Sequence, residues 1–272
     1  MSTLAVIGGG RMGEALIVTA VNGGMRAGDI TVVEPDARRA AALRDSLGVR
    51  TGDLAGAVAG AGAVALVVKP QVVSGVLDSV NGLLTDGQLI VSLVLGVRID
   101  TIIRVSGLPS AAVVRACPNL PITRGSGFTA ITPSARVRPG QLKLAESLFS
   151  AGGPVEIVTE PQLDVVSVVS GSTPAWYCYL VETLTDAGVL LGLGHQLSAL
   201  IAERALIGAG ALLRDSDTSA AQVRAAVSSP GGSTMAGVLV LEERAVRGAF
   251  MAAAAAGVER AREAAETAGT AS

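Results

Sequence analysis

The sequence predicts an α/β fold, a Rossmann-type doubly wound sheet followed by an all-helical domain. Short β-branched runs alternate with Ala-, Leu- and Arg-rich helical segments through the first half of the 272 residues, which is typical of βαβ units. A glycine-rich turn follows the first run. After Pro161, long segments with helical spacing follow one another with no strand between them. We therefore expect a dinucleotide-binding domain over 1–160 and a helical domain over 161–272.

The elements of the first domain are expected in a regular order. Five strands are predicted at LAVIG (4–8), DITVVEP (29–35), AVALVVKP (63–70), QLIVSLV (88–94) and AAVVRAC (111–117). Two more are predicted at GSGFTAITP (125–133) and PVEIVTE (154–160), on either side of a helix at about 141–151. In the second domain, helices are expected over 163–171, 175–193, 196–215 and 242–267.

Composition and charge exclude several classes of protein. With 50% hydrophobic and 16% charged residues, the chain is not disordered. The uncharged runs at 54–68 and 165–181 are shorter than the roughly 20 residues of a spanning helix. A net charge of −2 offers no basic stripe for nucleic acid, and a single histidine with two distant cysteines predicts no metal site. The N-terminus has no basic region before its apolar run, so a cytoplasmic location is expected.

A phosphate-binding turn is predicted at the end of the first strand. Gly8, Gly10 and Gly13 have the G-x-G-x-x-G spacing between a strand and a helix, and Arg11 and Met12 lie inside it. The first glycine allows a tight turn, the second lets a pyrophosphate approach the backbone, and the third lets the helix pack on the strand. We assign all five residues to a dinucleotide site.

The cofactor preference depends on the end of the second predicted strand. Glu34 stands where the motif places an acid on the ribose, which gives a slight preference for NADH over NADPH. Arg38 and Arg39 follow closely, and either could hold a 2′-phosphate or belong to a solvated helix start. NADPH and NADH both remain open.

Five ordered motifs give the chain a family resemblance. IGGGRMGEAL (7–16), VVKPQ (67–71), ACPNLP (116–121), SGSTPAW (170–176) and SSPGGSTMAG (228–237) resemble those of Δ1-pyrroline-5-carboxylate reductases, in the same order. The resemblance implies hydride transfer from NAD(P)H to the C=N bond of a cyclic imino acid, giving proline. It also implies a homodimer through the helical domain, with each active site completed by the partner subunit, and larger rings of dimers in some members.

The resemblance also assigns roles outside the glycine turn. It places the backbone of Lys69 and Pro70 along the cofactor, Leu95 beside the nicotinamide and Asn119 on the nicotinamide or substrate. In the last motif it makes Thr234 the hydroxyl near the imine nitrogen and Ser229 a carboxylate contact. Gly231, Gly232 and Ser233 complete this substrate loop; the alternative is a plain helix start capped by Ser233.

Some positions depart from the family pattern. Where the family usually has Met, Gly and Tyr, this chain has Cys117, Thr173 and Trp176. The larger Val94 and Leu95 occupy positions where the family has small residues. A paralogous reductase of a related cyclic imine is therefore one alternative, and a non-catalytic NAD(P)-binding sensor is another. Two further classes fit less well. A β-hydroxyacid dehydrogenase needs a lysine in the helical region, where this chain has none, and a deazaflavin reductase does not explain SPGGST.

Overall fold

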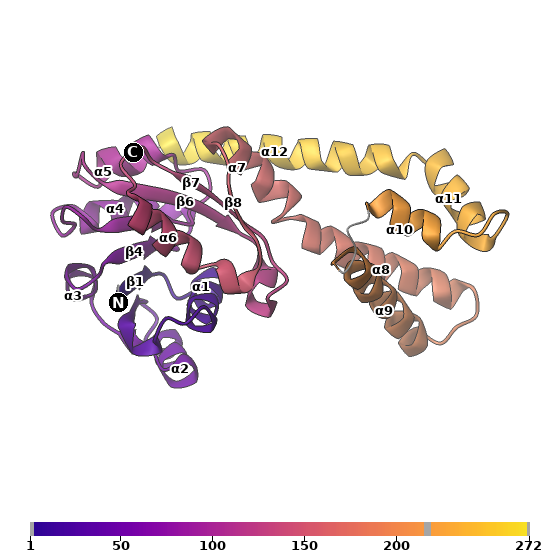
Figure 1. The fold of residues 1–272 in the computed structure, drawn as a ribbon, viewed down its shortest axis with the longest axis horizontal. Coiled ribbons are helices and arrows are strands. Elements are labelled where there is room, and N and C mark those ends of the chain that lie inside the picture. The colour runs from indigo at the N-terminus through magenta and orange to yellow at the C-terminus, as the bar shows by residue number, and fades with distance from the viewer. Residues whose placement is uncertain (1–2, 215–218, 271–272) are drawn as a thin grey trace. The chain divides into compact units, whose positions relative to one another are not determined.

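The computed structural model describes residues 3–214 and 219–270, except the side chains of Pro70 and 264–270. The chain forms two compact units, Met1–Gly171 with Val258–Ser272 and Ser172–Gly257. Unit 1 contains the sheet, and unit 2 is built from helices (Figure 1).

Unit 1 contains an eight-stranded sheet in the order β3-β2-β1-β4-β5-β6-β7-β8. The strands are β1 (Leu4–Ile7), β2 (Ile30–Val33), β3 (Arg50–Thr51), β4 (Ala63–Leu66), β5 (Leu89–Ser92), β6 (Ala112–Pro118), β7 (Thr129–Pro133) and β8 (Val155–Ile157). The first six are parallel, with Leu4 of β1 level with Ile30 and Ala63 of its two neighbours. The Rossmann order and the seven predicted strands are confirmed.

Two features of the sheet differ from the expected parallel arrangement. Strand β7 pairs antiparallel with β6, and β8 is parallel to β7. The connection between β6 and β7, 119–128, is shorter than the dozen or so residues that a parallel crossover requires. Strand β3 was not predicted, because two residues are too few to show a pattern.

Helices cover both faces of the sheet. On one face, α1 (Arg11–Asn22), α2 (Ala37–Leu47) and α6 (Pro139–Ser147) bury a core with the alternate strand residues. On the other lie α3 (Leu54–Ala59), α4 (Val73–Val80), α5 (Ile99–Val105) and α7 (Glu160–Val169). The connections contain the 3₁₀ turns η1 (Ala27–Asp29), η2 (Pro70–Val72), η3 (Leu120–Arg124) and η4 (Ser150–Gly152). This two-sided burial explains why the central strands β1 and β4 are apolar throughout.

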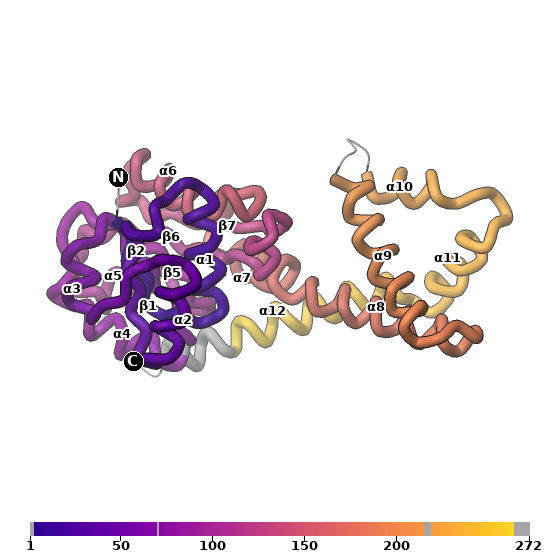
Figure 2. The backbone as a smooth tube through the Cα atoms, turned by 90° about the horizontal axis from the view of Figure 1, so that it is seen from below, coloured from indigo at the N-terminus to yellow at the C-terminus, as the bar shows by residue number. Residues whose placement is uncertain are grey.

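Unit 2 contains α8 (Thr173–Leu190), α9 (His195–Arg214), α10 (Ala220–Ala226), α11 (Ser233–Glu243) and the first part of α12 (Val246–Thr270). Helices α8 and α9 lie side by side (Figure 2). The Ser198 hydroxyl donates to the Thr185 carbonyl at 2.9 Å and occupies the space that a Cβ on Gly188 would need. The Trp176 ring meets the edge of Phe250 at 6.4 Å, which joins α8 to α12.

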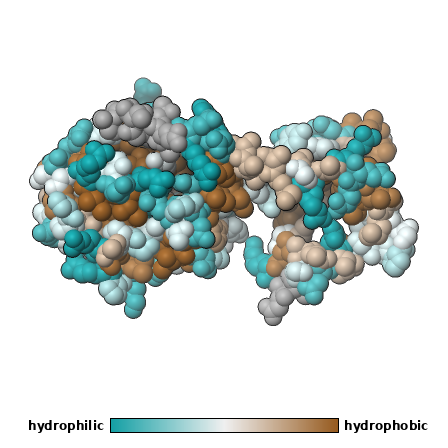
Figure 3. Space-filling model, turned by 90° about the horizontal axis from the view of Figure 1, so that it is seen from above, coloured by the Kyte–Doolittle hydropathy of each residue, from teal (hydrophilic) through white to brown (hydrophobic). Residues whose placement is uncertain are grey.

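Unit 2 exposes many large apolar side chains, and apolar residues lie among polar ones on the face of it that Figure 3 shows. Those exposed include Tyr179, Leu184, Leu190, Leu191, Leu200, Ile207, Leu239, Leu241 and Met251. Among the described residues, α9 is the one helix long and apolar enough to cross a membrane by length and composition, and only 11% of its apolar window is buried. Glu203 and Arg204 lie near its middle, where charges are costly in lipid.

Candidate active site

The glycine turn between β1 and α1 has the shape that a dinucleotide needs. Gly8 has φ +108°, and a Cβ there would overlap the Val67 carbonyl oxygen. A Cβ on Gly13 would overlap the carbonyl oxygen of Gly8. Gly10 is exposed, and a Cβ on it would meet no described atom within 4 Å. Two glycines are therefore required by packing, while the third leaves the backbone open to a ligand.

Helix α1 begins directly at this open surface. Its N-cap is Gly10, and the described structure shows no side-chain bond at that cap. The first amides of the helix therefore lack a side-chain acceptor and suit a pyrophosphate. Arg11 and Met12 form the first turn, Arg11 exposed and Met12 half-buried. These features fit the predicted cofactor.

Glu34 follows β2, and its carboxylate binds the backbone of the glycine turn. Its Oε2 accepts from the Gly9 amide at 2.8 Å, and its Oε1 accepts from the Asp36 amide at 3.0 Å. Each carboxylate oxygen can accept a further hydrogen bond, so Glu34 can still bind ribose hydroxyls.

The other unit 1 residues follow neighbouring strands. Lys69 follows β4, Leu95 follows β5 and Asn119 follows β6. They lie at the carboxyl ends of parallel strands, beside the switch between β1 and β4 where α/β sheets bind ligands. Lys69 is exposed, and its carbonyl accepts from the Val72 amide at 3.1 Å. Pro70 opens η2, but its side chain lies outside the described residues.

Asn119 forms hydrogen bonds to two other segments of unit 1. Its Oδ1 accepts from the Phe128 amide at 2.9 Å, and its Nδ2 donates to the Ser170 carbonyl at 3.3 Å. The side chain thus joins the end of β6 to the start of β7 and to the end of α7. One proton and one lone pair of the amide remain for a ligand.

Two departures from the family pattern prove to be core residues. Val94 is buried among the side chains of α4 and α5, and Cys117 packs with Ala130 and Leu163. Burial raises the pKa of the Cys117 thiol to about 11. Leu95, in contrast, is 51% exposed at the carboxyl edge of the sheet. Of these three, only Leu95 can face a ligand.

The predicted substrate loop lies in unit 2, between α10 and α11. Gly231 has φ +70°, and the Gly232 amide donates to the Ser229 carbonyl at 3.0 Å. Gly232 is the N-cap of α11, and no side-chain cap bond is present in the described structure. A helix start capped by Ser233 is therefore wrong, because Ser233 is the first helical residue. Ser229, Ser233 and Thr234 are all exposed.

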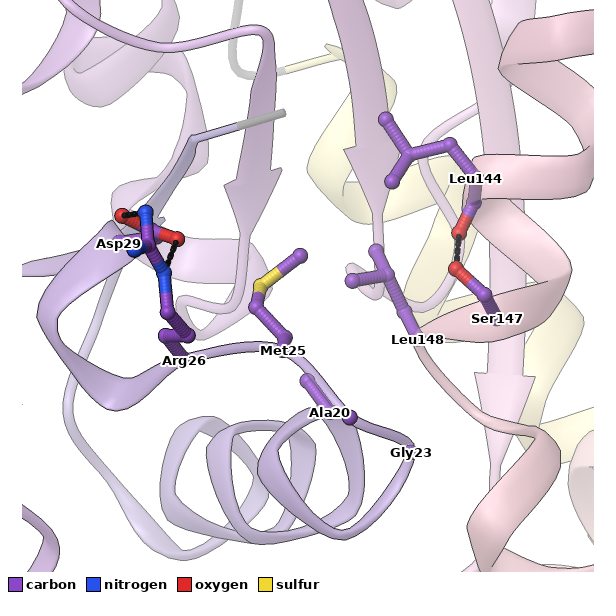
Figure 4. A pocket seen from close by; sticks show the side chains of 9 residues that line it. Ala20, Gly23, Met25, Arg26, Asp29, Leu144, Ser147 and Leu148 are labelled. Carbon is purple, nitrogen blue, oxygen red and sulfur yellow. Dashed lines mark hydrogen bonds and ion pairs between the residues drawn. The ribbon is translucent and has the colours of Figure 1, made fainter. Parts of the chain in front are cut away.

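Among the described residues of unit 1, two of the hollows border α1. One, of 310 Å³, lies beside the glycine turn between α1 and η3 and is lined by Arg11, Glu14, Ala15, Val18, Leu120, Thr123 and Arg124. The other, of 230 Å³, lies at the opposite end of α1, against α6 (Figure 4). There Arg26 Nε pairs with Asp29 Oδ2 at 2.8 Å and holds the pKa of that carboxyl below its usual range. The second hollow contains none of the predicted site residues.

Sequence reasoning missed Gly9, and it named Arg39 only as a candidate for the 2′-phosphate and not as a support of the glycine turn. Gly9 is buried and bonded through its backbone, and Arg39 donates to the Gly9 carbonyl at 2.7 Å. A third glycine in GGG was the available signal for Gly9. No local signal shows that Arg39 would turn back toward the first strand. Within the described residues, no group of three or more His, Cys, Asp or Glu could hold a metal ion.

Fold and site together define an oxidoreductase that binds a nicotinamide dinucleotide. A family model described as NADP oxidoreductase, coenzyme F420-dependent, matches residues 3–96, and one described as pyrroline-5-carboxylate reductase dimerisation matches 160–264. Pyrroline-5-carboxylate reductase of Synechocystis is 38% identical over 262 residues, covering 96% of this chain and 97% of the relative. The Escherichia coli K12 enzyme is 32% identical, covering 92% and 93%. The chain belongs to the pyrroline-5-carboxylate reductase family.

Solved structures agree with this assignment. A pyrroline-5-carboxylate reductase from Coxiella burnetii has a TM-score of 0.91 at 32% identity and covers 97% of this chain and 98% of its own. The Plasmodium falciparum protein, solved with NADP bound, has a TM-score of 0.85 at 23% identity, with the same coverage, and supports the fold. The family and fold predicted from the ordered motifs are confirmed.

Proposed function

We propose that this chain reduces 1-pyrroline-5-carboxylate to L-proline, with NADPH or NADH as the hydride donor. The observation that carries the proposal is the likeness to reductases of this name over 96% of the chain. The structure adds support, because the glycine turn, Glu34 and the edge residues lie together at one end of a Rossmann sheet.

The nicotinamide supplies the hydride when the cofactor is bound. The protein's tasks are then to hold the substrate carboxylate, aim the C=N bond and let one proton reach nitrogen. Gly10 and the first amides of α1 would hold the pyrophosphate, and Glu34 the ribose. The backbone of Lys69 and Pro70 would lie along the cofactor, and Leu95 beside the nicotinamide. Asn119 would contact the nicotinamide or substrate through its remaining proton and lone pair, while its two hydrogen bonds hold the 119–128 connection and the Ser170 carbonyl.

The loop before α11 is our proposed carboxylate site. Its glycines leave the first amides of α11 without a side-chain cap, and such amides attract an anion. Ser229 would add a hydroxyl contact, and Thr234 would hold the imine nitrogen and the proton that reaches it.

The first experiment is a turnover assay. Purified protein is mixed with NADH or NADPH and pyrroline-5-carboxylate, and loss of reduced-nicotinamide absorbance is followed. We expect turnover with both cofactors. A six-membered cyclic imino acid is assayed as a second substrate, because turnover of that compound alone would identify a paralogous reductase. Cofactor binding without turnover on any cyclic imine would identify a sensor protein.

A substitution then tests the loop. Thr234→Ala should lower kcat by about tenfold or more, the effect of losing a hydroxyl that assists proton transfer. Cofactor affinity should stay unchanged, and Thr234→Ser, which keeps the hydroxyl, should retain most of the rate. Equal loss of rate and cofactor affinity would mean that the segment supports the fold.

We further propose a homodimer through the helical domain, with the functional boundary near residues 160 and 161. The dimerisation model over 160–264 and the exposed apolar side chains of unit 2 support it. A second copy covering α9 explains its apolar surface better than a membrane does. Rings of such dimers and completion of each site by the partner subunit belong to the same proposal, as does a cytoplasmic location.

A further inference from the structure

We propose that the two consecutive arginines after β2 have different tasks. Arg39 positions the phosphate-binding turn, and Arg38 is the residue that meets the 2′-phosphate of NADPH. The proposal rests on the cofactor site of the proposed function, but not on the identity of the imine. It names the residue that sets the choice between NADPH and NADH.

Arg39 is already bound to the glycine turn. Its Nε donates to the Gly9 carbonyl at 2.7 Å, and its Nη2 pairs with Glu14 Oε2 of α1 at 2.6 Å. Glu34 accepts from the amide of the same glycine at 2.8 Å. Side chains from the β2–α2 region therefore hold both backbone polar groups of Gly9.

Packing fixes Gly9 as well. The residue is buried, and a Cβ on it would lie 2.7 Å from Leu43 Cδ1 and 3.1 Å from Glu34 Oε2. Its peptide immediately precedes Gly10, where the backbone opens to the pyrophosphate. A shift of Gly9 would move this surface, whichever nucleotide is bound. The Arg39 bonds therefore serve NADH and NADPH alike.

Arg38 differs in its surroundings. Its amide donates to Asp36 Oδ1 at 2.8 Å, which caps α2. Its side chain is exposed and makes no hydrogen bond or ion pair within residues 3–214 and 219–270. It stands in the first turn of α2, close after the acid that takes the ribose, which is where a 2′-phosphate falls in this fold.

Because Arg39 has bonding partners and Arg38 has none among the described residues, Arg38 is the guanidinium group that can turn to the 2′-phosphate. Arg39 would have to break two charge-assisted bonds to turn fully to a phosphate, and the glycine turn would lose its support. Arg38 is free to move. A phosphate beside Glu34 is repelled by the carboxylate, and the positive charge of Arg38 offsets that repulsion. The balance between Glu34 and Arg38 therefore sets the preference.

Binding of two fragments tests the proposal without the reaction. ADP-ribose and 2′-phospho-ADP-ribose are titrated calorimetrically into the full-length protein, Arg38→Gln and Arg39→Gln. Arg38→Gln should weaken 2′-phospho-ADP-ribose by about tenfold, the loss of one charge-assisted contact, and leave ADP-ribose within about twofold. Arg39→Gln should weaken both fragments by a common factor, so that their ratio is unchanged.

Two further variants separate positioning from folding. Glu14→Gln removes the ion pair of Arg39 from the α1 side. It should weaken both fragments by a common factor smaller than that of Arg39→Gln. Arg39→Lys, which keeps the charge but has one donor nitrogen in place of the guanidinium fork, should regain part of both affinities. It also serves if Arg39→Gln does not fold. If Arg39 only stabilised the fold, its substitution would lower the thermal midpoint and leave the fragment affinities of the folded protein unchanged.

The opposite pattern would overturn the proposal. Selective loss of 2′-phospho-ADP-ribose in Arg39→Gln, or an unchanged fragment ratio in Arg38→Gln, would assign the phosphate to Arg39 or to neither residue. Failure to reduce any cyclic imine would contradict the proposed function and leave these ratios as they are. The two failures are thus distinguishable.

Discussion

At the scale of single residues, the glycine turn shows what a motif can and cannot reveal. The spacing of Gly8, Gly10 and Gly13 could be predicted because each glycine serves the local path from strand to helix. The GGG run offered a signal for Gly9, but its close confinement could not be predicted, because the confining side chains, Leu43 and Glu34, come from α2 and the end of β2. A position that the motif leaves free is thus fixed by distant parts of the chain.

The openness of Gly10 allows binding to be tested separately from folding. A methyl group there meets no described atom within 4 Å, and the backbone, with φ −65° and ψ −170°, suits any residue. Gly10→Ala should therefore leave the thermal midpoint unchanged while lowering affinity for NADH and NADPH by about tenfold or more, because the methyl group occupies the pyrophosphate's approach.

Gly8→Ala supplies the contrast for this measurement. Its φ of +108° and its overlap with Val67 should lower the midpoint itself. Fluorescence titration and thermal melts measure both variants. Wild-type cofactor affinity in Gly10→Ala would show that the dinucleotide does not lie on this turn.

At the scale of elements, the β-branched runs predicted the strands but not all of their directions. Hydrophobic period identifies a buried strand, whereas direction depends on the length of the connection, which reverses β7 after β6. A helix start was expected within SSPGGSTMAG, and α11 begins at Ser233, one residue before the start that a Ser233 cap would give, since a Pro-Gly-Gly turn ends the preceding segment. The anchoring of α7 was not predicted, because Arg115 of β6 meets the first residue of α7 across 45 positions of the sequence, and no local pattern shows such a contact.

Helix α7 is held by an ion pair at its first residue. Arg115 of β6 is 3% exposed, and its Nη1 meets Glu160 Oε1 at 2.8 Å. The same oxygen accepts from the Ile99 amide, at the start of α5, at 2.9 Å. Glu160 therefore ties α7 to β6 and to the segment after Leu95. At the other end of α7, Asn119 holds the Ser170 carbonyl.

A double-mutant cycle measures this coupling. Glu160→Gln leaves the Arg115 charge buried, and among the described residues the remaining ion-pair partner is Asp164, 4.0 Å away. We expect a loss of about 2 kcal/mol in the free energy of unfolding, because breaking a buried pair from one side leaves a charge uncompensated. In an Arg115→Met background the same change should cost less than about 1 kcal/mol. Urea denaturation measures all four proteins, and strictly additive losses would show that the pair is not coupled.

At the scale of the whole molecule, the helical unit exposes what a folded chain normally buries. The sequence predicted its helices from their spacing, but spacing cannot tell a side chain buried by its own chain from one buried by a second copy. Leu190 and Leu191 are more than four-fifths exposed, and α9 is apolar along most of its length. Exposed apolar surface of this extent indicates an interaction site, and the dimerisation model over 160–264 favours a second copy.

Two matched isoleucines test which surface a second copy covers. Ile207 of α9 is 53% exposed, and Ile157 of β8, in unit 1, is 54% exposed. Ile207→Glu should change the fold of the single chain little, since the side chain is half in solvent, but it would place a charge inside the proposed interface, where an unpaired charge is strongly unfavourable. Sedimentation equilibrium should show Ile207→Glu as a monomer and Ile157→Glu with the mass of the wild-type dimer. Reductase activity should fall with the dimer, because each active site is proposed to need the partner subunit. A dimer of undiminished affinity in Ile207→Glu would place the interface away from α9, and α9 would then need another partner to cover it.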